Sequence, residues 1–121
     1  MSVRDTIYGL LDAAMADGIN VYRTPAEQIK GPAVVVGTMS WAPDRMTSLA
    51  RLEWTVTIPL LTPISKTAYS IPDLEDLSLE VAAALLDENI RVVGYTTDGT
   101  VTEGGVDYLG GTIEAIYKEN T

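Results

Sequence analysis

The stretch from Leu49 to Thr62 constrains the fold of this chain more than any other part of the sequence. Apolar residues occupy every second position within it: Leu52, Trp54, Val56, Ile58 and Leu60. Polar and charged residues separate most of them, and this two-residue period is typical of a long β-strand with one buried face. Pro59 lacks a backbone donor, so it indicates an edge, a bulge or the end of pairing. The sequence therefore predicts a sheet organised around this strand, with Trp54 in the core.

Two segments begin with the S-x-x-D pattern of a capping box, Ser2 to Asp5 and Ser70 to Asp73. In such a box, the hydroxyl and the carboxylate satisfy amide donors that the first turn of a helix leaves free. We expect the first helix to run to Ala16 and to be stopped by Gly18. The second helix is expected to run to about Asp87.

The second predicted helix is apolar on two sides. One stripe consists of Leu74, Leu77, Val81, Ala84 and Leu85, and a second one beside it of Leu79, Ala82, Ala83 and Leu86. Both stripes are covered within the chain if this helix lies between the sheet and the first helix. Alternatively, the second stripe contacts a neighbouring subunit.

Four further segments predict strands, namely Ile19 to Arg23, Ala33 to Gly37, Ile90 to Thr97 and Val106 to Lys118. The stretch from Thr38 to Ser48 is expected to be irregular. Asp98-Gly99 is expected to be a turn that continues as a flexible connection to Gly105. Gly110-Gly111 indicates a bulge or a close backbone approach. The order predicts an α+β fold (α-β-β-β-α-β-β): a mixed, mostly antiparallel sheet of about five strands with two helices packed on one face.

The residue types limit the chemistry available to this chain. Its 121 residues are the size of a single domain, 1–121, and they include no Cys and no His. Disulfides, thiolate metal sites and catalysis by Cys or His are therefore excluded. No nucleotide-binding loop and no spacing for a Ser-Lys mechanism occur. We predict no catalytic, cofactor-binding or metal-binding residues, and no enzymatic activity.

The charge of the chain argues against nucleic acid as a binding partner. There are 17 acidic against 8 basic residues, a formal net charge of -9, and the basic residues form no run. Tight binding to a phosphate backbone is therefore not expected. The apolar runs are too short to cross a membrane, and the N-terminus leads into a helix that is not a signal peptide. We expect synthesis and folding in a cytoplasm.

Two predicted loops beside the long strand, Thr38 to Ser48 and Pro63 to Tyr69, combine large apolar side chains with charged ones. This mixture is typical of a subunit interface. For Trp41, a contact with another subunit competes with a role in capping the core. The predicted interface residues are Met39, Trp41, Asp44, Arg45, Met46, Lys66 and Tyr69.

Several segments together resemble a known family in order, length and pattern. They are VRDTIYGLLDAAMADGINVY, PAVVVG, the loop with Trp41, LEWTVTIPLL and DLEDLSLEVAAALL. Nearly the whole chain resembles the tail terminator, or tail completion, proteins of long-tailed bacteriophages, particularly those that infect actinobacteria. The resemblance brings no catalytic residues with it.

The resemblance implies a structural virion protein. Such proteins cap the growing tail tube as a hexameric ring, end its polymerisation and form the surface that joins tail to head. The implied partners are further copies of the chain, the tail tube protein and head-tail connector proteins, with DNA passing through an acidic bore without specific binding. The implied location is the head-proximal end of the virion tail, after assembly in the cytoplasm of the host bacterium. The alternatives are a head-closure or other connector ring, and a small-molecule-binding domain or enzyme with an unrecognised pocket.

Overall fold

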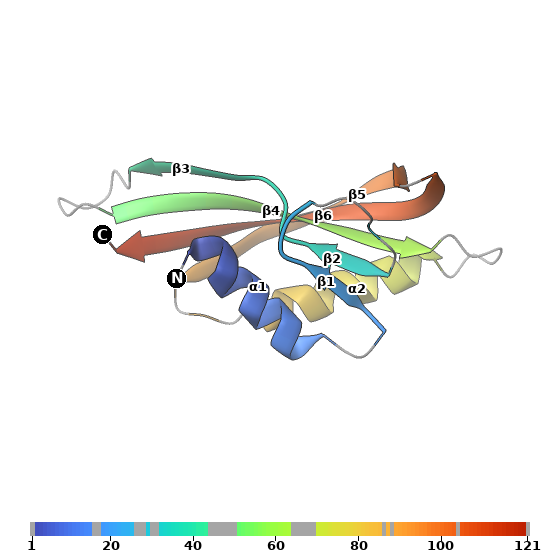
Figure 1. The fold of residues 1–121 in the computed structure, drawn as a ribbon, viewed down its shortest axis with the longest axis horizontal. Coiled ribbons are helices and arrows are strands. Elements are labelled where there is room, and N and C mark those ends of the chain that lie inside the picture. The colour runs from blue at the N-terminus through green and yellow to red at the C-terminus, as the bar shows by residue number, and fades with distance from the viewer. Residues whose placement is uncertain are drawn as a thin grey trace.

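A six-stranded sheet with two helices packed on one of its faces makes up the described part of the chain (Figure 1). The computed structural model describes residues 2–15, 18–25, 29, 32–43, 51–63, 70–85, 87, 89–103 and 105–120. In chain order the elements are α1 (Val3–Ala14), β1 (Asn20–Tyr22), β2 (Ala33–Val35), β3 (Met39–Pro43), β4 (Arg51–Pro63), α2 (Ser70–Ala84), β5 (Ile90–Glu103) and β6 (Val106–Asn120). The predicted α+β class, with a mixed, mostly antiparallel sheet, is confirmed.

Strand β4 lies inside the sheet, between β2 and β3 on one side and β6 on the other, and the sheet is organised around it. It pairs with β6 along its whole length, from Arg51 opposite Asn120 to Pro63 opposite Tyr108. Its other edge is shared, because β3 pairs with the first half of β4 and β2 with the second half. β1 lies parallel to β2 at one edge, and β5 lies antiparallel to β6 at the opposite edge.

The main core lies between the helices and the face of the sheet that they cover. The helical side consists of Val3, Ile7, Leu11, Leu74, Leu77, Val81 and Leu85, and the sheet side of Val34, Val36, Val56, Ile58, Leu60, Ile113 and Ala115. These positions follow three- and four-residue steps in the helices and two-residue steps in the strands, so each element turns one apolar face inward. Trp54 lies at the margin of this core and is half-buried, not fully enclosed.

Both helices form where the sequence predicts them. At the start of α1, the Asp5 amide donates to the Ser2 hydroxyl at 3.1 Å, as expected for the predicted cap. The helix ends at Ala14 with Met15 as its C-cap, and Ala16 lies outside the described residues. The regular part of α2 ends at Ala84. In the described residues, neither helix is long and apolar enough to span a membrane.

The expectation that Thr38 to Ser48 is irregular is wrong for its first part. Residues Met39 to Pro43 form β3, which pairs antiparallel with β4 so that Met39 faces Val56 and Pro43 faces Leu52. The segment has little strand signal of its own, since it contains a serine and a proline in five residues. The long partner strand β4 supplies the hydrogen bonds and the packing surface that hold it extended. The sheet therefore has six strands among the described residues, and 44–48 lie outside them.

The expectation of a turn at Asp98-Gly99 is also wrong. Strand β5 continues to Glu103, and the register between β5 and β6 shifts between Thr97 and Gly99. Gly99 has a positive φ of 88° there, which suits a β-bulge as well as it suits a turn. The chain reverses later, beside Gly105, whose φ is 79°.

The paired glycines of β6 make room for side chains of the neighbouring strand. A Cβ atom on Gly110 would lie 2.5 Å from Cγ2 of Val101, and one on Gly111 would lie 2.6 Å from Cε1 of Tyr95. The predicted close approach is therefore present, but side chains of β5 and not a backbone make it. The bulges lie in β5.

Strand β4 runs through Pro59 because the proline nitrogen faces away from β6. Thr57 accepts a hydrogen bond from the Gly37 amide at 2.8 Å and donates one to the Thr38 carbonyl at 2.9 Å. Backbone groups alternate sides along a strand, so the nitrogen of Pro59 points to the same side as that of Thr57. On that side the chain crosses from β2 to β3, and no hydrogen bond to β6 is lost.

Candidate functional site

One end of the sheet forms an arm, which we define as β3 with the paired residues 51–56 of β4 and 115–120 of β6. Figure 1 shows this end of the sheet continuing past the start of α1. The helix layer covers the central part of the sheet more fully than the arm. Side chains of the arm that face the helix side therefore become more exposed toward its outer edge.

Three aromatic residues lie in one row across the arm. Trp41 on β3 is opposite Trp54 on β4, and Trp54 is opposite Tyr117 on β6. Residues directly opposite each other point to the same face of a sheet, and the alternation along β4 places this row on the face that packs against the helices. Trp54 is half-buried and donates from its Nε1 to Oε1 of Glu119 at 3.2 Å. Trp41 is 58% exposed.

A hollow of about 440 Å³ separates the arm from the start of α1. It is lined by Ser2, Val3, Arg4, Arg23, Met39, Trp54 and Glu119. Trp54 and Met39 reach it from the sheet, and the first turn of α1 faces them. The position of this first turn therefore decides how much of Trp54 is covered.

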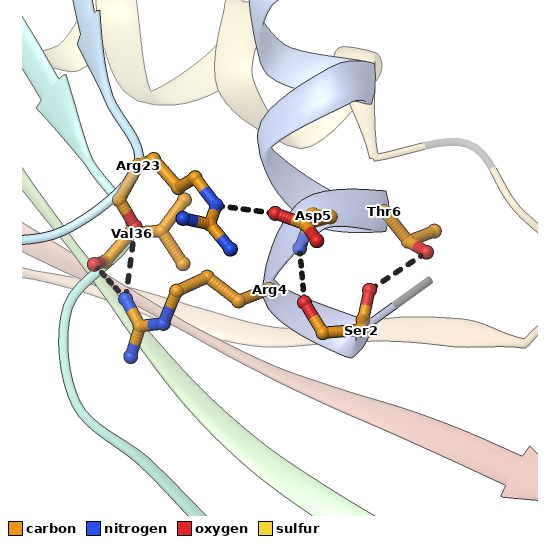
Figure 2. Close-up of polar contacts among 6 residues, drawn as sticks. All are labelled: Ser2, Arg4, Asp5, Thr6, Arg23 and Val36. Carbon is orange, nitrogen blue, oxygen red and sulfur yellow. Dashed lines mark hydrogen bonds and ion pairs between the residues drawn. The ribbon is translucent and has the colours of Figure 1, made fainter.

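Arg4 fixes the first turn of α1 to the backbone that crosses from β2 to β3 (Figure 2). Its Nη1 donates to the carbonyl oxygens of Val36 at 2.6 Å and of Arg23 at 3.0 Å, and its Nη2 donates to that of Gly37 at 2.9 Å. A planar guanidinium can serve several carbonyl groups at once because its donors point in fixed, divergent directions. These contacts orient both α1 and β3.

A salt bridge between Arg23 and Asp5 lies beside these contacts, as Figure 2 shows. Nε of Arg23 donates to Oδ1 of Asp5, and both side chains are substantially exposed. The hydrogen bond from Arg23, together with one from the Ser2 hydroxyl, holds the pKa of the Asp5 carboxyl below its usual value. Asp5 therefore remains ionised to lower pH than an unpaired aspartate.

The predicted interface residues divide into two that the structure describes and five that lie outside the described residues. Met39 and Trp41 lie two positions apart on β3 and share the helix-facing side of the arm, where Met39 is half-buried and Trp41 exposed. The five outside are Asp44, Arg45, Met46, Lys66 and Tyr69. The structure thus brings Met39 and Trp41 together on one strand instead of one loop.

Two residues of the second stripe of α2 are not covered within the described chain, while Ala82 is half-buried. Leu79 is 69% exposed, and Ala83, one turn later, is also exposed. The interpretation that the sheet and α1 enclose α2 on both sides is therefore wrong for these positions. The first stripe alone is buried against the sheet, since α1 lies beside α2 in the same layer (Figure 1). Leu86 lies outside the described residues.

An acidic hollow at the other end of the sheet is a feature that the sequence interpretation missed. Asp73, Asp76 and Glu80 line a hollow of about 380 Å³ whose apolar part includes Ile19 and Leu77. The three carboxylates follow one another at steps of three and four residues, which puts them on one side of a helix. That spacing could have identified the hollow, but the sequence interpretation considered only the favourable effect of acids in the first turn of a helix.

A metal-binding cluster was sought among the described residues. Across the described ranges, no three His, Cys, Asp or Glu residues are arranged to hold a metal ion. A scan against protein-family models and a search of curated proteins both found nothing that matches this chain. Among the described residues, the exposed large hydrophobic side chains are Trp41 on β3, Leu79 on α2, Val93 on β5 and Val106 on β6.

Proposed function

We propose that this chain is a structural subunit of a homo-oligomeric ring, a hexamer, that caps the tail tube of a long-tailed bacteriophage. In that position it ends tail polymerisation and provides the surface that joins the tail to the connector proteins of the head. Two considerations support this proposal. One is the resemblance of the sequence to tail terminator proteins, and the other is the distribution of exposed apolar residues.

The observation that carries the proposal is the exposure of Trp41 and Leu79 on two different elements. Trp41 lies on the arm and is 58% exposed, while Leu79 lies on α2 and is 69% exposed. A ring of identical subunits needs two different surfaces on each copy, because each subunit contacts its two neighbours through different patches. Large apolar side chains that are exposed in the monomer and buried on assembly are typical of such patches.

The acidic character of the chain fits a protein through which DNA passes. With a formal net charge of -9 on each copy of the chain, the ring repels the phosphate backbone and leaves the DNA mobile.

The proposal includes no catalysis and no cofactor. Screens for hydrolase activity and nucleotide turnover should therefore give no activity above background, and activity abolished by a single serine or carboxylate substitution would contradict this part.

The decisive experiment adds the purified protein to tail tubes of the phage that encodes it. Electron microscopy should show extra density at one end of each tube, and tubes assembled in its presence should stop at a uniform length. Trp41→Ala and Arg45→Glu should lower the yield of completed tails. Val106→Ala is a matched control, because Val106 is 52% exposed but lies at the opposite end of β6 from the arm.

Two outcomes would contradict the proposal. If the protein binds emptied heads and not tube ends, the chain belongs to a head-closure or connector ring. If Trp41→Ala and Arg45→Glu proteins fold normally and complete tails at the parental yield, these residues have no part in assembly.

Light scattering over a range of protein concentrations measures the mass of the free protein. It reports whether the protein is a monomer or a ring before it binds a tail tube.

A further inference from the structure

We propose that β3 pairs with β3 of a second copy of this chain, antiparallel and centred on Trp41, and so joins two copies across a two-fold axis. The free outer edge of β3 and the exposure of Trp41 on that edge carry the proposal. It does not depend on the proposed ring function. A two-fold contact closes on itself, so the dimer is the form of the free chain, and it opens before Trp41 contacts a neighbour in a ring.

The outer edge of β3 presents backbone groups that no described strand takes up. Among the described strands, β4 alone pairs with β3, and Figure 1 shows β3 along the outer border of that end of the sheet. The backbone of Thr57 on β4 faces this side, since it is hydrogen-bonded to the crossing that leads into β3. Backbone groups alternate sides along a strand, so those of Ser40 and Ala42 face β4. Those of Met39 and Trp41 face outward and offer their amides and carbonyls to a further strand.

The two other edge strands are protected against such pairing. β5 includes charged residues, Arg91 and Asp98 among them, and its register is irregular at two positions. β1 has only three residues, so it offers a single outward position, Val21. Charges, bulges and shortness are the usual means by which proteins prevent edge-to-edge pairing. In contrast, Met39–Pro43 pairs regularly with β4 and has no charged side chain, and its proline is the last residue, where it does not interrupt the strand.

The absence of charge on β3 lets two acidic copies approach through this edge. The chain has a formal net charge of -9, so two copies repel in most orientations. On β4, Glu53 lies opposite Ala42. In the paired form, at least three strand spacings of about 4.8 Å separate Glu53 from the partner's Glu53, which exceeds the Debye length of about 8 Å at physiological ionic strength. Asp44 and Arg45 follow β3 in the sequence, have opposite charges and lie outside the described residues.

The register of the pair follows from the residues that face outward. With Trp41 opposite the partner's Trp41, these two residues exchange two backbone hydrogen bonds at the centre of the pair. Met39 then lies opposite the partner's Pro43, so the missing N–H of proline affects only the two ends of the pairing. Trp41, which is 58% exposed in the single chain, gains an aromatic neighbour on either side, Trp54 of its own copy and the partner's Trp41.

The space beside β3 suits a strand as short as β3 itself. β2 and β3 pair with the same side of β4, so a strand added to β3 lies in line with β1. Tyr22, the last residue of β1, is in line with Pro59 of β4, whereas β3 begins opposite Val56. A long strand that continued past the start of β3 would therefore meet β1. A five-residue strand fits, and β3 has that length.

Proline at position 41 tests the backbone pairing. The Trp41 amide faces outward, so Trp41→Pro removes a hydrogen bond of the dimer and none of the bonds to β4. In light scattering, the mass of the parent should rise with concentration to that of a dimer. Trp41→Ala should weaken the association by about tenfold, and Trp41→Pro should abolish it.

Thr100→Pro is the matched control for that variant. It makes the same backbone change on the outer edge of β5, because the backbone of Thr100 faces away from β6. Self-association of this variant should equal that of the parent. Circular dichroism verifies the fold of each variant.

Cross-linking tests the register without proline, because the parent chain has no cysteine. In the proposed pair, Ser40 lies opposite the partner's Ala42 with the two Cα atoms about 4.5 Å apart, within the range of a disulfide. Ser40 and the partner's Ser40 are diagonal neighbours roughly 7–8 Å apart, too far for an unstrained bridge. Oxidation of a mixture of Ser40→Cys and Ala42→Cys copies should therefore give several-fold more cross-linked dimer than either variant alone.

The results separate this proposal from the proposed function. If the parent stays monomeric and the mixture cross-links no better than the single variants, the pairing is refuted, even where the protein still caps tail tubes. If Trp41→Pro associates as the parent does, another surface joins the copies and the proposal fails. Loss of tube capping in Trp41→Pro, without any dimer of the parent, would mean that β3 pairs with the tube protein instead of a second copy. If the mixed cross-link dominates but tubes are not capped, the pairing stands and the proposed function fails.

Discussion

Trp41 and Trp54 lie directly opposite each other on neighbouring antiparallel strands, yet Trp54 is half-buried and hydrogen-bonded while Trp41 is 58% exposed. The difference arises because β3 is an edge strand of the arm, whereas Trp54 sits one strand further in, beside the start of α1. Trp54 therefore has a role in stability, whereas the role proposed for Trp41 is in association.

The first prediction separates these two roles. Trp54→Ala should lower the free energy of unfolding by about 2–3 kcal/mol, somewhat less than the range for full burial, because part of the ring is already in water. Trp41→Ala should change it by less than about 0.5 kcal/mol, as for an ordinary surface substitution. Urea unfolding of the monomer measures both values. Equal losses in the two variants would mean that Trp41 is part of the core.

A second prediction concerns the crossing from β2 to β3. A Cβ atom on Gly37 would lie 2.8 Å from Cδ of Pro59 and 2.8 Å from the carbonyl oxygen of Thr57. Neither a proline ring in the central strand nor a backbone carbonyl can move aside easily, so Gly37→Ala should destabilise the fold by about 1–3 kcal/mol. Thermal and urea unfolding measure the change.

Gly9→Ala is the matched control for that prediction. Gly9 lies on the exposed side of α1, and a Cβ atom there meets nothing within 4 Å. Alanine is a better helix former than glycine, so this variant should gain about 0.5–1 kcal/mol of stability. Opposite signs for the same chemical change are expected, and a stabilising Gly37→Ala would show that the crossing is not tightly packed.

The third prediction concerns Arg4, whose guanidinium donates to three backbone carbonyls. Arg4→Ala leaves the carbonyl groups of Val36 and Gly37 without this hydrogen-bond donor. It should lower the free energy of unfolding by about 2 kcal/mol, as for the loss of hydrogen bonds to a charged group. Arg4→Lys should restore only part of the loss, because an ammonium group cannot match the fork of donors. Urea unfolding measures both variants, and full recovery by lysine would show that charge alone is sufficient.

The fourth prediction is a pH dependence that arises from Asp5. Its pKa is lowered in the folded chain by Arg23 and Ser2, so the ionised carboxylate stabilises the fold above the pKa of the unfolded chain. That contribution is lost as the pH falls through the lower, folded pKa. The stability difference between the parent and Asp5→Asn should therefore be constant near neutral pH and shrink below about pH 4.

Thermal unfolding of both proteins across this pH range checks the prediction. Asp12→Asn removes an exposed carboxylate from the same helix without touching Arg23, and it serves as the control. A stability difference that stays constant down to the most acidic pH would show that Asp5 and Arg23 are not coupled in solution.

The amino-acid sequence by itself determined which segments turn an apolar face inward. The two-residue period of β4 and the first stripe of α2 are local patterns that repeat the same burial at fixed steps. The capping box at Ser2 is also local, because its hydrogen bond joins residues three positions apart. These patterns were sufficient to predict the α+β class and the helices on one face. They also indicated that α2 has a second apolar stripe.

Tertiary structure decided the features that depend on a neighbouring segment. Residues Met39 to Pro43 are a strand because β4 offers them an unpaired edge, and Asp98-Gly99 is a bulge because β6 continues beside it. The exposure of Trp41 and Leu79 likewise depends on where the helix layer ends, which no local pattern encodes. Hydrogen-bond pairing and burial between distant segments are properties of the assembled sheet, so only the three-dimensional structure shows which of these side chains stay exposed.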